Sequence, residues 1–299
     1  MGIEAQSAMV AAVKKEKPEE RSAIDEKGRL LVSAAVGIGS DLEDRTNALV
    51  AAGVDVLVVD SSHGYSSFVI SAVKTIKNKY PELVVMAGNV ATFDGARALS
   101  DAGADIVRVG MGPGSICTTR IVTGMGVPQI SAVSSAVRAL DGRTTTIVAD
   151  GGIRQMGDIA KALAFGAHAV MLGSMLAGYD QSPGDTVEKE GKRWKMYRGM
   201  GSVSAMKKGG AERYGQKRDT EEKKLIAEGV EGLVSYKGDV ADFLVQTEGS
   251  LRSSMYYLGA SDLDTFFSSS RAIKISTAGL VESHPHEIAI TDTGRNYMK

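Results

Sequence analysis

AGVDVLVVD, at residues 52–60, has two close counterparts in the chain, AGADIVRVG at 102–110 and FGAHAVMLG at 165–173. Each copy has a glycine at its second position that can end a helix, and a short apolar run follows. Continuous apolar runs are typical of strands that are buried on both faces of a sheet. The three copies therefore predict a helix-to-strand turn that repeats along the chain.

Other apolar runs alternate with helical patterns in the same way. Strands that alternate with helices favour a parallel sheet with helices packed against it. We expect strands at about 30–36, 54–60, 83–89, 105–110, 145–150 and 169–173, and helices at 41–52, 66–79, 92–103, 128–140 and 155–165.

Polar or glycine-rich residues follow nearly every predicted strand. Both a (β/α)8 barrel and a doubly wound sheet bind ligands at the carboxyl ends of their strands. Because the polar residues follow nearly every strand and not only one or two of them, the barrel is favoured. A helix at 3–15 and a charged linker at 16–29 come before the first strand. The sequence thus predicts an α/β fold of the TIM (β/α)8 type, with six of the eight strands identifiable.

The pattern changes after about residue 183. A strand is predicted at 192–198, and the polar stretch 207–225 has the composition of a mobile surface loop. Beyond it we expect a strand and turn at 230–238, a helix at 239–257 and a short helix at 261–268.

The composition is that of an ordinary globular protein. Of 299 residues, 43% are hydrophobic and 24% are charged, and the formal net charge of −1 gives no support for nucleic acid or an anionic membrane as a partner. A single cysteine rules out an internal disulfide and fits a reducing compartment, so we expect a cytoplasmic protein. No apolar run approaches the roughly 18–20 residues that span a bilayer.

That cysteine lies in the loop GPGSICTTR at 112–120. A lone cysteine is usually a small buried hydrophobe, whereas this glycine-rich loop exposes a thiol and backbone groups to a ligand. Arg108, Arg120 and the start of the next helix could supply a positive field that favours the thiolate. The loop by itself leaves a nucleophile and a tolerated small residue equally open.

Ten short motifs, taken in order, are similar to those of the IMP dehydrogenase family. The resemblance runs from about residue 30 to the C-terminus. The motifs are DSSHG at 60–64, AGNV at 87–90, RVGMG at 108–112, GPGSICTTR at 112–120, ADGGI at 149–153, GSMLAG at 173–178, YRGMGS at 197–202, RY at 213–214, EGVEG at 228–232 and ESHPH at 282–286.

The resemblance implies an NAD-dependent oxidation of IMP to XMP through a covalent thioimidate on Cys117. Residues 203–227 would be a mobile flap that carries Arg213 and Tyr214, with Arg213 as the general base for hydrolysis. Arginine normally stays protonated, so a second route through Thr119 and Glu228 could assist.

The resemblance also implies three groups of ligand-binding residues. K⁺ would be held by one chain's loop and a neighbouring chain's 276–299 tail, within a homotetramer. IMP is assigned to Ser115, Asp150, Gly152, Gly173, Ser174, Tyr197, Gly199, Met200, Gly201 and Glu228; NAD to Asp60, Ser61, Ser62, Asn89, Arg108, Gly110 and Gly112; and K⁺ to Gly112, Gly114, Cys117, Glu282, Ser283 and His284.

The sequence departs from the family pattern in two places. The linker at 16–29 stands where the family's paired regulatory domains are usually inserted, so we interpret residues 1–299 as a single catalytic domain. The family's segment with the first two barrel strands has no counterpart. A fragment, a barrel completed by another chain and a protein without full activity all stay open.

Two other functions compete with the dehydrogenase. GMP reductase shares the fold, the cysteine and the Thr-Glu pair, but the Arg-Tyr pair in a long flap, DSSHG and the ESHPH tail favour the dehydrogenase. A non-catalytic nucleotide-binding or assembly subunit is the alternative of another class.

Overall fold

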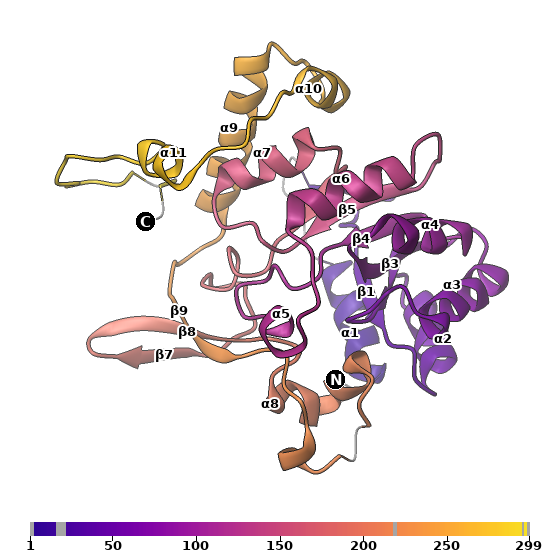
Figure 1. Cartoon of the computed structure of the whole chain (residues 1–299). Helices are drawn as coiled ribbons and strands as arrows, with labels where there is room; N and C mark the ends of the chain where they lie inside the picture. Colours follow the sequence, from indigo (N-terminus) through magenta and orange to yellow (C-terminus); the bar gives the residue numbers. More distant parts are fainter. Residues whose placement is uncertain (1–2, 16–21, 218–219, 295, 298–299) are drawn as a thin grey trace.

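The computed structural model describes residues 3–15, 22–217, 220–294 and 296–297. In these ranges the chain forms a six-stranded sheet and a separate three-stranded sheet (Figure 1). No helix among the described residues is long and apolar enough to cross a membrane. Residues 16–21 of the predicted charged linker lie outside the described residues.

The larger sheet confirms the predicted fold class. All neighbouring strands are parallel and follow the order of the chain, as expected when each strand is followed by a helix that returns the chain. The result is six strands of a curled, partial TIM barrel. The strands are β1 (Ser33–Val36), β2 (Val56–Asp60), β3 (Val84–Val90), β4 (Ile106–Val109), β5 (Thr146–Asp150) and β6 (Ala169–Met171).

Alternate residues of each strand enter two different cores. Leu57 and Val107 point outward and are fully buried beneath the helices. Val58, Met86 and Val148 form a small cluster on the inner face of the curled sheet. Because Arg108 pairs with Val148 in the sheet register, its charged side chain belongs to this inner face.

Helices cover the outer face of the sheet. Most of them pack against one or both of the strands that they connect, and the first helix packs against the second helix and β1. The helices are α1 (Ile3–Val13), α2 (Leu42–Ala51), α3 (Ser67–Lys79), α4 (Phe93–Asp101), α6 (Gln129–Ala139) and α7 (Met156–Ala164), with the short α5 (Thr119–Thr123) in the loop after β4.

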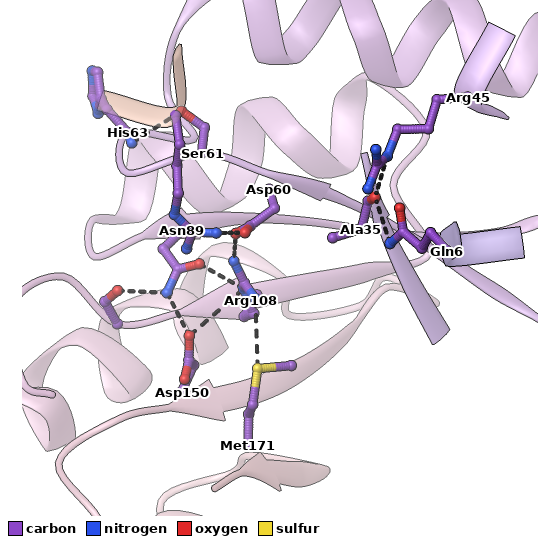
Figure 2. A network of polar contacts seen from close by, with 12 residues as sticks. Gln6, Ala35, Arg45, Asp60, Ser61, His63, Asn89, Arg108, Asp150 and Met171 are labelled. Carbon is purple, nitrogen blue, oxygen red and sulfur yellow. Dashed lines mark hydrogen bonds and ion pairs between the residues drawn. The ribbon is translucent and has the colours of Figure 1, made fainter. Parts of the chain in front are cut away.

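The sheet has two outer edges, at β1 and β6. Among the described residues, each of these strands pairs with one neighbour only. At the β1 edge, the side chains of Gln6 and Arg45 both donate to the carbonyl of Ala35, at 3.2 and 3.0 Å (Figure 2). Unpaired edge groups can pair with other chains, and these two donors satisfy one of them.

The second sheet is antiparallel and projects to the left in Figure 1. It consists of β7 (Thr186–Lys189), β8 (Lys192–Arg198) and β9 (Glu231–Ser235). The sequence predicted β8 and β9 but not β7, because Thr-Val-Glu-Lys is polar and three of its four residues are exposed. The C-terminal helices are α9 (Ala241–Leu258), α10 (Leu263–Ser269) and α11 (Thr277–Glu282), of which α11 was not predicted.

The polar stretch that predicted a surface loop contains short helical turns instead. Met206 and Ala211 are buried, so the segment packs against the protein at these two points. The turns are α8 (Val203–Ala205), the π-helical turn η1 (Met206–Gly210) and the 3₁₀ turns η2 (Ala211–Tyr214) and η3 (Glu222–Lys224).

Candidate active site

The thiol of Cys117 stands at one end of a short chain of hydrogen bonds. It donates to Oγ1 of Thr119 at 3.2 Å, and this hydroxyl donates to Oε2 of Glu228 at 2.7 Å. The thiol and the hydroxyl are two positions apart in the sequence, and the carboxylate of Glu228 comes 109 positions after Thr119. Their order gives the thiol proton a path toward a carboxylate.

Backbone hydrogen bonds hold the cysteine loop against the segment that carries Glu228. The amide of Thr118 donates to the carbonyl of Glu228, and the amide of Val230 donates to the carbonyl of Ile116, both at 2.9 Å. The amide of Glu228 in turn donates to the carbonyl of Gly201. Three segments far apart in the sequence are thereby fixed around the thiol.

Two adjoining cavities meet beside this loop. The larger, of about 230 Å³, holds all five residues predicted to be catalytic, and the smaller has a volume of about 130 Å³. Both are lined by Pro113, Gly114, Asp150 and Gly151, so they lie side by side at the end of β5. A further hollow of about 660 Å³, beside Tyr179 and Phe243, contains none of the candidate side chains.

Most residues predicted to bind IMP or NAD line these two cavities. Ser115, Asp150, Gly152, Gly173, Ser174 and Tyr197 line the smaller one. Ser61, Ser62, Asn89, Gly110, Gly112, Gly199, Met200, Gly201 and Glu228 line the larger one.

Asp60 and Arg108, which were predicted to bind NAD, are not among the residues that line either cavity. Arg108 is 6% exposed and lies between two carboxylates: Nη2 pairs with Asp60, and Nε lies 3.6 Å from Asp150 (Figure 2). The Nε group donates to Asn89 at 2.6 Å, and the amide of Asn89 donates to Asp150 at 2.8 Å. This network links the carboxyl ends of four neighbouring strands, β2, β3, β4 and β5.

Burial governs the ionisation of this network. It lowers the pKa of the Arg108 guanidinium from its ordinary value, while the charge of Asp150 opposes the change. Arginine starts from so high a pKa that it stays protonated, so the network holds a buried positive charge between two carboxylates.

The segment after β8 brings Arg213 and Tyr214 to the larger cavity. Arg213 forms an ion pair with Asp60, the same carboxylate that pairs with Arg108. The amide of Ser62 also donates to the carbonyl of Arg213 at 3.1 Å. In this arrangement the segment that carries Arg213 is closed over the end of β2.

Tyr214 lies near both ends of the hydrogen-bond chain. Burial raises the pKa of its phenol to about 12, and Cys117 and Glu228 add to the increase. On the smaller cavity, burial likewise raises the pKa of Tyr197, a shift that a hydrogen bond with Ser115 opposes. Both phenols therefore stay neutral at physiological pH and can donate hydrogen bonds.

Residues 1–286 match the family model described as the IMP dehydrogenase / GMP reductase domain. The chain belongs to this family. It is 54% identical over 273 residues to inosine-5'-monophosphate dehydrogenase of Escherichia coli (strain K12), a match over 91% of this chain and 56% of that protein.

Two other relatives give the same picture. The Streptococcus pyogenes inosine-5'-monophosphate dehydrogenase is 51% identical over 276 residues, which are 92% of this chain and 56% of that protein. A cysteine-to-alanine variant of Trypanosoma brucei GMP reductase, solved with guanosine 5'-monophosphate, superposes with a TM-score of 0.83 at 44% identity, over 91% of this chain and 55% of that one. The chain spans about half the length of these relatives.

The cation site implied by the family resemblance is divided in the structure. Gly112, Gly114 and Cys117 lie together at the larger cavity. Glu282, Ser283 and His284 are at the end of α11, far from α5 in Figure 1. The structure therefore does not bring these two groups of predicted K⁺ ligands together within one chain.

Two features of the site were not predicted from the sequence. Asp60 and Arg213 are 153 positions apart, and nothing in either motif indicates that they form an ion pair. The position of Arg108 on the inner face could have been predicted from the sequence. Side chains alternate along a strand, and Arg108 occupies the same face of the sheet as Val58 and Val148.

Proposed function

We propose that the protein catalyses the NAD-dependent oxidation of IMP to XMP. The observation that carries this proposal is the contact of the Cys117 thiol with Thr119, and of Thr119 with Glu228, where two cavities meet. A thiol with an adjacent acceptor is the arrangement that activates a cysteine nucleophile.

In the first step the sulfur of Cys117 forms a bond with C2 of the purine, and the thiol proton leaves toward Thr119 and Glu228. Ser61, Ser62 and Asn89 of the larger cavity would hold NAD, which would supply the acceptor for the hydride that leaves C2, and a thioimidate would remain on Cys117. The smaller cavity would hold the ribose and phosphate, with Asp150 accepting hydrogen bonds from the ribose hydroxyls.

In the second step a water oxygen forms a bond with C2 and the C–S bond breaks. The water gives one proton to a base and the other to the departing sulfur of Cys117. The family resemblance assigns the base to Arg213. In the structure Arg213 is paired with Asp60, and a neighbouring carboxylate favours the protonated guanidinium. The ion pair would have to open before Arg213 could accept a proton, whereas the Thr119–Glu228 pair is already in contact.

The family also contains GMP reductases, and this alternative rests on the Trypanosoma brucei structure. The dehydrogenases of Escherichia coli and Streptococcus pyogenes are the more similar in sequence. The Arg-Tyr pair at the larger cavity also favours the dehydrogenase, with NAD as cofactor, K⁺ bound between subunits and a homotetrameric assembly.

The test is to incubate the protein with IMP and NAD, in the presence of K⁺, and to record NADH by its absorbance. NADH formation supports the proposal, and NADPH consumption with GMP supports the reductase. A protein that does neither would be a non-catalytic nucleotide-binding subunit. Cys117→Ala should abolish both turnover and the purine adduct detected by mass spectrometry, and an intact adduct in this variant would contradict the role of Cys117.

A further inference from the structure

The loop that carries Cys117 runs from Met111, just past β4, to Val127, just before α6. Its first half is held by the backbone hydrogen bonds to residues 228–230. Its second half stands in solvent: Ile121 is 89% exposed and Met125 is 62% exposed. A loop with so little buried surface needs another contact to fix its conformation.

The side chain of Arg120 supplies such a contact. Its Nε and Nη2 groups donate to the carbonyl of Met111 at 3.2 and 3.0 Å, and Nη2 also donates to the carbonyl of Val127. These two carbonyls are the two ends of the loop. One guanidinium therefore joins the point where the loop leaves β4 to the point where it enters α6.

Two glycines make room for this side chain. A Cβ atom on Gly112 or on Gly126 would lie 2.5 Å from Cγ of Arg120, which is too close for any real contact. Both glycines also have positive φ angles, of +78° and +146°. The aliphatic part of Arg120 thus lies between the two glycines, and its fork reaches the carbonyls beyond them.

Arg120 touches neither cavity and forms no ion pair with any carboxylate in the described ranges. Its donors are directed at backbone carbonyls, a geometry that the planar fork of arginine provides. Lysine cannot reproduce it, because an ammonium group on a flexible stem is a point charge. The position of the fork, rather than its charge, is therefore the property that the loop uses.

We propose that Arg120 is a positioning residue that holds the two ends of loop 111–127 together and so keeps Cys117 and Thr119 in contact with Glu228. Thr119 directly precedes Arg120 in α5, so a shift of Arg120 moves the hydroxyl that lies between the thiol and the carboxylate. The kinetic consequence rests on the proposed function, but the effect on the loop does not.

The first test uses Arg120→Lys, which keeps the positive charge, with the exposed Arg138→Lys on α6 as its control. Because Cys117 is the only cysteine, alkylation by iodoacetamide without nucleotides reports on this loop alone. We expect Arg120→Lys to raise the alkylation rate about three-fold or more and to speed hydrogen exchange in 111–127 only, since the loop opens more often. With IMP and NAD, kcat should fall about ten-fold while KM for NAD changes less than about two-fold, since misplaced reacting groups slow the chemical step.

A second test leaves Arg120 in place. Gly112→Ala and Gly124→Ala have nearly the same backbone strain, at φ +78° and +74°, but only the Cβ at Gly112 would meet Arg120. The rate of hydrogen exchange in loop 111–127 should increase more in Gly112→Ala than in Gly124→Ala.

Two results would overturn the proposal. The first is an Arg120→Lys variant whose alkylation rate and whose hydrogen exchange in loop 111–127 equal those of the wild type. The second is a variant in which hydrogen exchange is faster across the whole sheet, because Arg120 would then stabilise the entire fold and not this loop. If the wild-type protein oxidises no IMP, the proposed function fails, while alkylation and exchange still decide the role of Arg120.

Discussion

At the scale of single residues, the site combines a thiol, a hydroxyl and a carboxylate that form a one-way chain of donors. The hydroxyl of Thr119 accepts from the thiol and donates to Glu228, so a proton can move toward the carboxylate without rearrangement of side chains. In the proposed reaction, the same pair would accept a proton from the water that releases the product.

Removing the hydroxyl tests this chain. We expect Thr119→Val to slow the initial burst of NADH, because the thiol loses its acceptor, and to slow steady-state turnover by roughly 10- to 100-fold, because a general base typically contributes at least that much. The covalent purine adduct should accumulate and be detectable by mass spectrometry. Thr118→Val is the matched neighbour, and an equal loss of turnover in both variants would contradict the relay.

Tyr214 gives the site a dependence on alkaline pH. The pKa of its phenol is raised to about 12, so the folded state binds the proton more tightly than the unfolded state does. The stability that this provides is fully present below about pH 10 and is lost as the pH rises toward 12. Between pH 9 and 11 the melting temperature of the wild type should therefore fall more steeply than that of Tyr214→Phe.

The control for this comparison is Tyr256→Phe, at a residue that is 82% exposed. Thermal unfolding in buffers of matched ionic strength measures all three proteins. If the melting temperature of Tyr214→Phe fell with pH as steeply as that of the wild type, burial of this phenol would not contribute to the loss of stability at alkaline pH.

At the scale of elements, a buried lysine fastens α1 to the barrel. Nζ of Lys14 lies 2.6 Å from Asp55, at the start of β2, and 3.2 Å from Asp25. The pKa of the Asp25 carboxyl is held well below its usual range, first by the backbone amide of Arg29. This network therefore stabilises the folded state above about pH 4 and weakens as the pH falls below it.

Lys14 and its neighbour form a natural pair of variants. We expect Lys14→Met to lower the free energy of unfolding by about 2 kcal/mol, because two carboxylates lose their partner. This loss is smaller than that for a fully buried ion pair, because both carboxylates are partly exposed. Lys15→Met, at an exposed position, should change it by less than about 0.5 kcal/mol. Denaturant unfolding measures both, and equal values would show that the ion pairs do not anchor α1.

The elements that the sequence predicted are those whose burial leaves a periodic pattern. All six parallel strands and the longer helices between them follow from continuous apolar runs that alternate with amphipathic segments, whereas the short α5 was not predicted. β7 and the turns at 203–214 leave no such pattern. β7 is polar and depends on its pairing with β8. The turns are buried only at two short stretches, 205–206 and 210–211, which are too short to form a periodic pattern.

At the scale of the whole molecule, the parallel order of the strands brings the motifs that follow β2 to β6 to one end of the sheet. This is why the residues of both cavities could be predicted as one site from motifs spread over about 170 positions. The ion pair of Asp60 with Arg213 could not be predicted from the sequence, because it depends on how the segment that carries Arg213 folds back across that end of the sheet. The two cavities share Asp150, so binding in one affects a side chain of the other.

Binding of IMP should therefore be measurable without turnover. A ligand that binds only the folded state at 100 times its dissociation constant stabilises it by about 2.7 kcal/mol, and IMP should raise the melting temperature accordingly. In Asp150→Asn we expect most of this increase to be lost, because an amide has only one acceptor oxygen for the ribose hydroxyls. The exposed Asp141→Asn should keep the full increase.

Each variant is compared with its own ligand-free form, because Asp150 also contacts Asn89 and Arg108 and its replacement changes stability without IMP. A full IMP-dependent increase in Asp150→Asn would contradict the assignment of this carboxylate to the nucleotide. Loss of the increase for IMP in all three proteins would instead show that the smaller cavity does not bind this nucleotide.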